Sequence, residues 1–218
     1  MSQINTVAVA SGNGGVGRFI TKALIRSKYV VVILSRKTNV SIPGAKFIVV
    51  DHIHHSNLVK SLEGIGAVVS AVVGVALLEA LLPLIGAALE AGVKRFVPSE
   101  YWIDQRDVGD LKSEYKALYE GDLNPKNITC KELIKHQDTL PWTSRNIGYF
   151  TDTTFIPEFG FDFANRKVTL LGDGNALVAW TSRYDVGEFV AAILRNPETH
   201  NQEITISADI VDTTDLLT

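Results

Sequence analysis

The amino-acid sequence predicts an α/β fold built on a parallel sheet with helices on both faces. Apolar runs without polar alternation recur along the first two-thirds of the chain, and stretches with helical spacing separate them. Strands that are buried on both faces have this continuous apolar pattern, and helices are the usual crossovers of a parallel sheet. A glycine-rich turn directly after the first apolar run supports the same prediction.

The expected elements alternate in order. Strands are expected over 6–10, 30–34, 46–50, 67–72 and 95–98, and helices over about 15–27, 56–63 and 76–91. A charged stretch, 104–124, has a looser pattern, and it is followed by an expected helix over about 126–137 and a strand over 142–146. Further on, Gly172-Asp-Gly-Asn175 is expected to join strands 168–171 and 177–181, before a helix over 185–194 and a strand over 203–207.

The glycine-rich turn has the pattern Gly12-x-Gly14-x-x-Gly17, between a β run and a helical pattern. Glycines allow a sharp turn and a close approach of the backbone to a pyrophosphate, and the helix N-terminus offers free N–H groups to it. We therefore expect a Rossmann-like, doubly wound sheet that binds a dinucleotide. The alternative is a glycine-rich turn without a ligand.

The end of the second apolar run indicates which dinucleotide. An NAD site usually carries an acidic residue here for the ribose 2′-OH. This chain instead has Ser35-Arg36-Lys37, and a guanidinium can bind a 2′-phosphate in bidentate fashion. The prediction is NADP(H), with two solvated surface charges as the alternative.

Composition excludes several classes of function. The chain has 218 residues, 46% of them hydrophobic and 21% charged, and its net charge of −3 gives no basic surface for nucleic acid. The single Cys130 and the absence of a signal-peptide pattern predict a cytoplasmic protein. The apolar stretch 65–93 is interrupted by Glu79, Pro83 and Glu90, which favours a buried strand and helix over a membrane span.

A histidine cluster follows the third expected strand. His52, His54 and His55 come after Asp51. Two adjacent histidines do not readily face one ion, so we expect no metal site. Asp51 stands where a doubly wound sheet approaches the adenine, with a helix-capping or loop role as the alternative.

The sequence lacks the Tyr-x-x-x-Lys pair of short-chain dehydrogenases, because lysine follows none of the six tyrosines at that spacing. The chain nevertheless resembles the NmrA-like and isoflavone-reductase-like family of atypical short-chain dehydrogenase/reductases. The segments that carry the resemblance are 7–18, 35–37, 69–74, 91–100, 140–143 with 148–150, and 172–174 through 180–181 to 185–187.

This resemblance implies an NADPH-binding Rossmann domain, here residues 1–150, and a partial, smaller C-terminal substrate lobe, residues 151–218, interleaved with it. The family's domain would span about 5–210. The candidate cofactor-binding residues are Ser11, Gly12, Asn13, Gly14, Gly15, Val16, Gly17, Arg36, Lys37, Asp51, Ala71, Val72 and Phe150.

The resemblance also implies a catalytic lysine at the start of the helix before a Pro-aromatic-Thr strand. Lys126 has this place ahead of Pro141-Trp-Thr143 and would act as a general acid or base. Lys131 is the competing candidate, and an exposed first-turn cation is the alternative for Lys126. The chain departs from the family pattern at Ser11, which replaces a glycine, and at Tyr101-Trp102, where reductases usually carry Phe-Gly.

Three functions follow from these observations. The first is an NADPH-dependent reductase of a small, aromatic or phenylpropanoid-like substrate. The second is a non-catalytic NADP(H) sensor that acts through a protein partner. The third, a sugar-nucleotide epimerase, is disfavoured by the missing Tyr-x-x-x-Lys.

Overall fold

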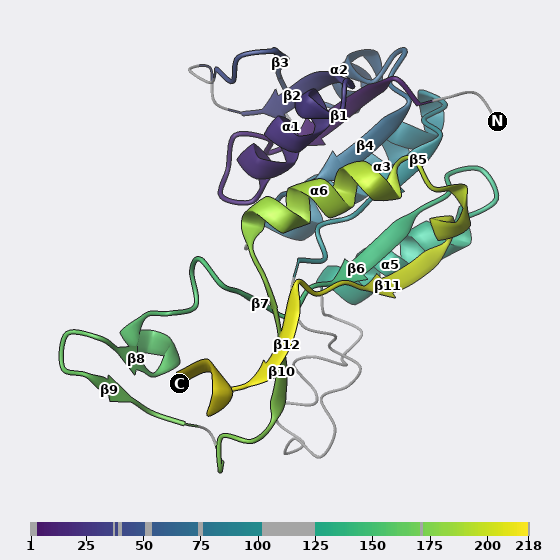
Figure 1. The fold of residues 1–218 in the computed structure, drawn as a ribbon. Helices are drawn as coiled ribbons and strands as arrows, with labels where there is room; N and C mark the ends of the chain where they lie inside the picture. The colour runs from purple at the N-terminus through teal and green to yellow at the C-terminus, as the bar shows by residue number, and fades with distance from the viewer. Residues whose placement is uncertain are drawn as a thin grey trace.

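The computed structural model describes residues 4–36, 38, 41–50, 54–73, 76–101, 125–170 and 172–217. An α/β body contains the N-terminal elements, and a smaller lobe with the C-terminal residues extends from it (Figure 1).

The body is centred on a five-stranded parallel sheet. Its strands are β1 (Thr6–Ala10), β2 (Val30–Ser35), β3 (Ala45–Val49), β4 (Ala67–Ser70) and β5 (Arg95–Val97), in the order β3-β2-β1-β4-β5. The five expected strands agree with these bounds to within two residues at each end. The predicted α/β fold with a parallel, Rossmann-like sheet is confirmed.

Two strands from later in the chain continue the body beside β5. A parallel bridge joins Phe96 to Trp142, which directly precedes β6 (Thr143–Asn146). Strand β11 (Gln202–Thr205) then pairs in parallel with β6. The chain therefore returns to the body after it has built part of the small lobe.

Helices cover both faces of the sheet. The side chains of β1 point alternately to the two faces of the sheet. Val7 and Val9 belong to one apolar cluster, and Ala8 and Ala10 belong to the other. The first cluster contains buried residues of α1 (Gly17–Arg26) and α6 (Arg183–Ile193). The second contains buried residues of three further helices, which are α2 (His55–Ser61), α3 (Ala76–Glu90) and α5 (Pro125–Lys135).

The apolar stretch 65–93 forms β4 and α3, as the sequence predicted. Leu81, Leu84 and Ile85 of α3 are buried in the core, which accounts for the hydrophobicity of this helix. No helix in the described part of the chain is both long and apolar enough to span a membrane.

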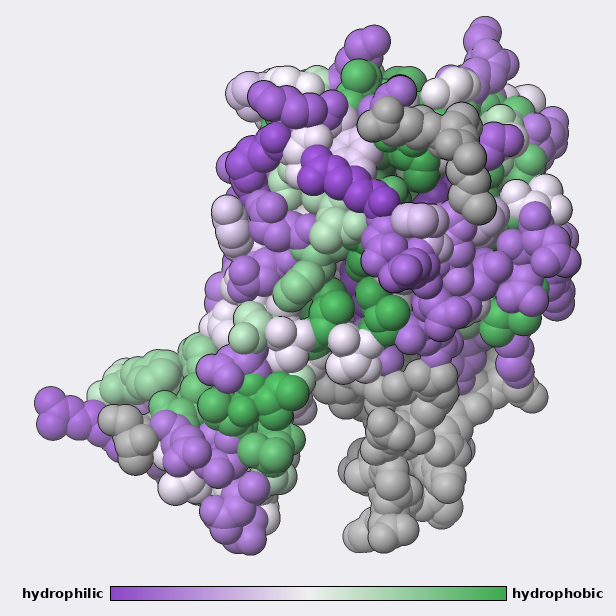
Figure 2. Space-filling view, turned by 45° about the vertical axis from the view of Figure 1, so that its right-hand side comes forward, coloured by the Kyte–Doolittle hydropathy of each residue, from purple (hydrophilic) through white to green (hydrophobic). Residues whose placement is uncertain are grey.

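The small lobe has short strands and an aromatic core. Strands β7 (Tyr149–Phe150), β10 (Leu177–Thr181) and β12 (Asp209–Asp212) form a sheet in the order β12-β10-β7, and β8 (Phe161–Asp162) pairs with β9 (Lys167–Val168). Phe155 stacks on Trp180 with ring centroids 5.3 Å apart and meets Phe161 edge-on. Figure 2 shows hydrophobic residues gathered on this lobe, where Phe159, Phe163 and Leu170 are exposed.

Short 3-10 helices complete the described elements. They are η1 (Pro157–Phe159), η2 (Pro197–Thr199) and η3 (Asp215–Leu217).

The expected hairpin between 168–171 and 177–181 is wrong. Strand β9 pairs with β8, whereas β10 pairs with β12 and β7. The chain already reverses at Arg166, which has a left-handed φ of 51°, so β9 has its partner before the glycine turn is reached. Gly172 and Gly174 do adopt positive φ, but they redirect the chain between two sheets.

The packing of α6 on α1 generates a stability prediction. A Cβ on Gly187 of α6 would lie 2.7 Å from the backbone oxygen of Phe19, so Gly187→Ala forces the two helices apart. We expect a loss of about 1–3 kcal/mol in the free energy of unfolding, measured by urea denaturation.

Gly86→Ala is the matched control, because it also replaces a helical glycine. Its added Cβ would lie 3.6 Å from the His55 ring, an ordinary contact, so better helix propensity should make this variant neutral or up to about 1 kcal/mol more stable. Equal effects of the two substitutions would contradict the close helix packing.

Candidate active site

The glycine turn connects the carboxyl end of β1 to α1. Ser11 follows the strand with a left-handed φ of 58°, and its N–H donates to the Leu34 oxygen at 2.9 Å. Gly14 N–H donates back to the Ser11 oxygen at 2.9 Å, and Arg18 N–H donates to the Gly14 oxygen at 3.1 Å. Ser11 thus adopts a conformation that favours glycine, at the place where the resemblance implies one.

Two glycines allow α1 to approach β1 closely. A Cβ on Gly17 would lie 2.2 Å from the Ser11 oxygen, and a Cβ on Gly12 would lie 2.8 Å from Thr21 Oγ1. The buried Thr21 hydroxyl donates to the Gly12 oxygen at 2.9 Å and fixes the helix against the turn. Side chains at either position would displace the helix N-terminus from the sheet edge.

The N-terminus of α1 is suited to a phosphate. The N-cap residue Val16 offers no side-chain hydrogen bond, and the first turn contains no acidic residue. A Cβ on Gly15 would meet no neighbour closer than Arg183 Nη1, at 3.9 Å. The helix dipole and this open approach fit the pyrophosphate of a dinucleotide.

Arg183 is a cation that the sequence analysis did not single out. It begins α6, and Asp152 holds its guanidinium through an ion pair between Nε and Oδ2 at 2.5 Å. Its guanidinium also lies over the ring of Phe19, 5.1 Å from the centroid. Its place beside Gly15 adds positive charge where a pyrophosphate would lie.

The residues expected to select NADP(H) are only partly described. Arg36 directly follows β2 and is exposed, beside the strand that leads into the glycine turn. Lys37 and Asp51 lie outside the described residues.

The carboxyl ends of β1, β4 and β5 meet at this edge. Ala71 N–H donates to the Ala10 oxygen at 2.9 Å, and the Ser99 hydroxyl donates to the Val72 oxygen at 2.6 Å. The structure thus brings the glycine turn together with Ala71 and Val72, both buried. Phe150 belongs to β7 of the small lobe, where its side chain is half-buried.

Lys126 reaches the same edge from the first turn of α5. Its Nζ lies 3.5 Å from Glu100 Oε2, and the two side chains are 21% and 9% exposed. Glu100 follows β5 in the segment 99–101, which lies next to β4 through the bond from Ser99. Lys131, the competing candidate, is exposed farther along the helix.

A buried cation and an aromatic ring lie near Glu100. The Arg145 guanidinium on β6 is fully buried and lies over the Tyr101 ring, 4.3 Å from the centroid. Tyr101 donates its hydroxyl hydrogen to the Ser70 oxygen at 2.8 Å. Arg145 therefore supplies positive charge from the protein interior, while Lys126 supplies it from a side chain that is partly exposed.

Burial changes the acid–base properties of this cluster. It raises the pKa of Glu100 to about 7, although Lys126 and Arg145 oppose the shift. Burial, with the neighbouring Glu100 and Glu203, also raises the pKa of the Cys130 thiol to about 12. Cys130 is therefore a neutral thiol and a poor nucleophile at neutral pH.

Glu100, Tyr101 and Arg145 were not predicted as site residues from the sequence. Glu100 had a recognisable signal, because an acidic residue at the carboxyl end of a buried strand lies where ligands bind in such sheets. Arg145 had none, since one arginine in a short strand does not reveal that it is buried.

The histidine cluster is only partly described, since Asp51 and His52 lie outside the described residues. His55 Nε2 lies 2.9 Å from Glu90 Oε2 on α3. Within the described ranges, no three His, Cys, Asp or Glu side chains are grouped to hold a metal ion.

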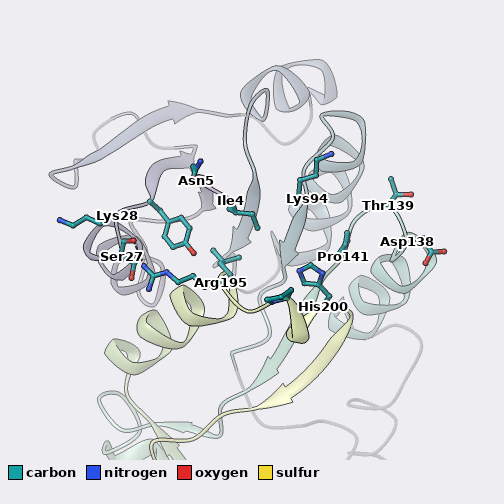
Figure 3. Close-up of a pocket in the computed structure, with 13 residues that line it drawn as sticks. Ile4, Asn5, Ser27, Lys28, Lys94, Asp138, Thr139, Pro141, Arg195 and His200 are labelled. Atoms are coloured by element: carbon teal, nitrogen blue, oxygen red, sulfur yellow. Dashed lines mark hydrogen bonds between the residues drawn. The ribbon is translucent and has the colours of Figure 1, made fainter. Parts of the chain in front are cut away.

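A cavity of about 820 Å³ lies at the opposite edge of the sheet (Figure 3). It is lined by residues before β1 and β5, among them Ile4 and Lys94. Lys28 and Lys94 point away from its centre, and Arg195 is held by the Ser27 oxygen at 2.7 Å. Ligands of open α/β sheets bind at the carboxyl ends of the strands, so this cavity is not our candidate site.

Comparison with known proteins agrees with this site. A family model described as NAD(P)H-binding matches residues 12–197. The chain belongs to this family. The match begins in the glycine turn and extends through α6, so it includes both the candidate site and the helix that packs on α1.

Among curated proteins, the chain is 29% identical to a bifunctional pinoresinol-lariciresinol reductase of Thuja plicata, over 94% of this chain and 70% of that protein. It is 32% identical to the oxidoreductase BOA1 of Botryotinia fuckeliana, over 92% of this chain and 70% of that protein. A structure solved with NADP+ and (+)-pinoresinol has a TM-score of 0.78 at 22% identity, over 99% of this chain and 74% of that one. The expected membership of the isoflavone-reductase-like and NmrA-like reductases is confirmed.

The raised pKa of Glu100 predicts a pH-dependent stability. Its ordinary value is 4.5 and its value in the folded protein is about 7, so the folded state binds more protons than the unfolded state between these pH values. The contribution of Glu100 to the free energy of unfolding should therefore be largest below pH 4.5 and be lost as the pH rises through about 7.

Glu100→Gln should remove this contribution, which is on the order of 2–3 kcal/mol. Urea denaturation at pH 5 and pH 7.5 measures it as the difference in pH dependence between the two proteins. The same pH dependence in both would show that Glu100 is not buried as an acid.

Proposed function

We propose that this protein is an NADPH-dependent reductase of a small aromatic compound of the phenylpropanoid type. The observation that carries the proposal is the presence of Lys126 at the same sheet edge as the glycine turn, in contact with Glu100. The named activities of the relatives support the substrate class.

The turn and the helix N-terminus would hold the cofactor. The N–H groups at the start of α1, with the residues 11–17, would bind the pyrophosphate, and Arg183 would add charge there. Arg36, with Lys37 beside it in the sequence, would bind the 2′-phosphate, and Ala71, Val72, Phe150 and Asp51 would border the rest of the cofactor. Bound NADPH supplies a hydride to the substrate carbon.

Lys126 would handle the proton of the reaction. Its ammonium reaches the sheet edge from α5, and its side chain is 21% exposed, so a substrate at this edge could contact it. Proton transfer from Nζ to the substrate atom that gains negative charge completes the reduction, and the reverse transfer deprotonates a phenol. The residues of the aromatic small lobe would line the substrate side of the site.

The relatives described above are named as a reductase and an oxidoreductase, so the comparisons do not support the alternative of a non-catalytic sensor. A small molecule is therefore the proposed partner. The cytoplasmic location and the domain boundary near residue 150 stay predictions.

The preference for NADPH is tested by Arg36→Ala. Loss of one charge-assisted contact to the 2′-phosphate should weaken NADPH binding by about 1.5–3 kcal/mol and leave NADH binding nearly unchanged. Fluorescence titration of the reduced nicotinamide measures both affinities.

Lys94→Ala is the charge-matched control, because it removes an exposed cation at the opposite sheet edge. It should change neither affinity. Equal loss of NADPH and NADH binding in Arg36→Ala would contradict a role in 2′-phosphate recognition.

Catalysis is tested by NADPH oxidation with a panel of aromatic ketones, enones and benzylic ethers, including (+)-pinoresinol. Lys126→Ala should lower turnover about 10²- to 10⁴-fold, the usual contribution of a positioned acid–base group. NADPH affinity should change little, since Lys126 would act on the substrate.

Lys131→Ala on the same helix is the control and should have a mild effect, because Lys131 is exposed away from the contact with Glu100. A larger loss of turnover in Lys131→Ala than in Lys126→Ala would show that Lys131, and not Lys126, transfers the proton. No oxidation of NADPH with any compound would contradict the proposed reductase.

A further inference from the structure

Glu100 is a buried acid with two different surroundings. Its Oε2 faces the Lys126 ammonium at 3.5 Å, whereas its Oε1 is buried without a hydrogen-bond partner among the described residues. A buried carboxylate is costly unless opposite charge or hydrogen bonds compensate it. The Lys126 contact is therefore the direct compensation that the described residues give to this carboxylate.

Arg145 provides the second compensation. Its guanidinium is fully buried, and its Nε and both Nη atoms have no hydrogen-bond partner in the described part of the chain. Its charge lowers the pKa of Glu100, as does that of Lys126. Because Arg145 is fixed on a strand and stacked on Tyr101, it stabilises the Glu100 anion even while Lys126 exchanges a proton with a substrate.

The contact with Glu100 also restricts the side chain of Lys126. A lysine has four rotatable side-chain bonds and loses considerable conformational entropy when its ammonium is fixed. Lys126 comes from the first turn of a helix, and Glu100 comes from the segment after β5, where the neighbouring Ser99 bonds to the Val72 oxygen. The contact therefore ties a flexible cation to a fixed point at the edge where the glycine turn also lies.

We propose that Glu100 is the positioning residue for Lys126, whose ammonium it holds at the sheet edge through Oε2 when its carboxyl is ionised. The inference rests on the proposed function for the chemistry that Lys126 performs. It goes beyond that function by assigning Glu100, Arg145 and Lys126 to one charge network. Glu100 itself needs no contact with the substrate.

The network makes the position of Lys126 depend on pH. The groups that act on Glu100 are Lys126 from α5, Arg145 from β6 and Glu203 from β11, with Tyr101 and Cys130 near them. Burial raises the pKa of Glu100 to about 7. Above that pH the carboxylate attracts the ammonium fully, and below it the neutral carboxyl attracts the ammonium less.

The first test needs no activity. NMR of the protein with 13C-methylated lysines follows each lysine signal from pH 5 to 9, and the Lys126 signal is assigned by its absence in Lys126→Arg. The Lys126 signal should move with a midpoint near pH 7 in the unchanged protein. This movement should disappear in Glu100→Gln, an uncharged variant of nearly the same shape.

Glu132→Gln is the matched control, because it also removes one carboxylate. Glu132 lies on the same helix as Lys126, but its carboxylate bonds to Lys135 and His136. It should preserve the Lys126 transition. The dispersed NMR spectrum of each variant also reports whether it is folded. An unchanged Lys126 transition in folded Glu100→Gln would overturn the proposal.

The second test uses the NADPH oxidation assay. Glu100→Gln should lower kcat about 10²-fold with little change in KM, because it misplaces Lys126 without removing it. In the unchanged protein kcat should fall below pH 7, as Glu100 becomes neutral. This fall should disappear in Glu100→Gln. Glu100→Asp should recover part of the rate, and a full rate in Glu100→Gln would overturn the proposal.

The two tests separate the failures. Loss of the Lys126 transition in Glu100→Gln together with full turnover in Lys126→Ala would support the charge network and contradict the proposed role of Lys126 in proton transfer. No NADPH oxidation by the unchanged protein, with the Lys126 transition still lost in Glu100→Gln, would contradict the proposed reductase and leave the charge network supported.

Discussion

The fit of α1 against the carboxyl end of β1 is the constraint on which the rest of the structure depends. A Cβ at Gly17 would lie 2.2 Å from the Ser11 oxygen, and Thr21 bonds to the turn at the base of the helix. This approach places the N-terminus of α1 at the edge of the sheet. Helix α6 can then pack closely on α1 at Gly187, and Arg183 at its start comes to lie beside Gly15.

The same sheet edge gathers the second half of the site because neighbouring parallel strands end together. Ala71, directly after β4, bonds to the end of β1, and Ser99, after β5, bonds to Val72 in the segment that follows β4. Glu100 is thereby carried to this edge, and α5 brings Lys126 to it. The site thus depends on strand order, and residues 115 positions apart, Ser11 and Lys126, come to share it.

Local sequence patterns predicted those elements of the fold that depend on residues close together in the sequence. Continuous apolar runs gave β1 to β5, and the glycine spacing gave the turn and the start of α1. The pairing in the small lobe was not predictable in this way, because β8, β9 and β12 are short and Gly172 suggested a hairpin that tertiary pairing overrides. Lys126 was predicted from the family resemblance. The burial of Glu100 and Arg145 depends on strand order, which the spacing of residues in the sequence does not reveal.

The central claim is that the glycine turn, and not the cavity at the opposite edge of the sheet, binds the dinucleotide. Two-dimensional NMR of the 15N-labelled protein during titration with NADPH tests it most directly. The amide signals of residues 12–18 should shift most, with little change at Lys94 and Thr139, which line the cavity at the opposite edge. Large shifts at Lys94 and Thr139 with an unchanged glycine turn would contradict it.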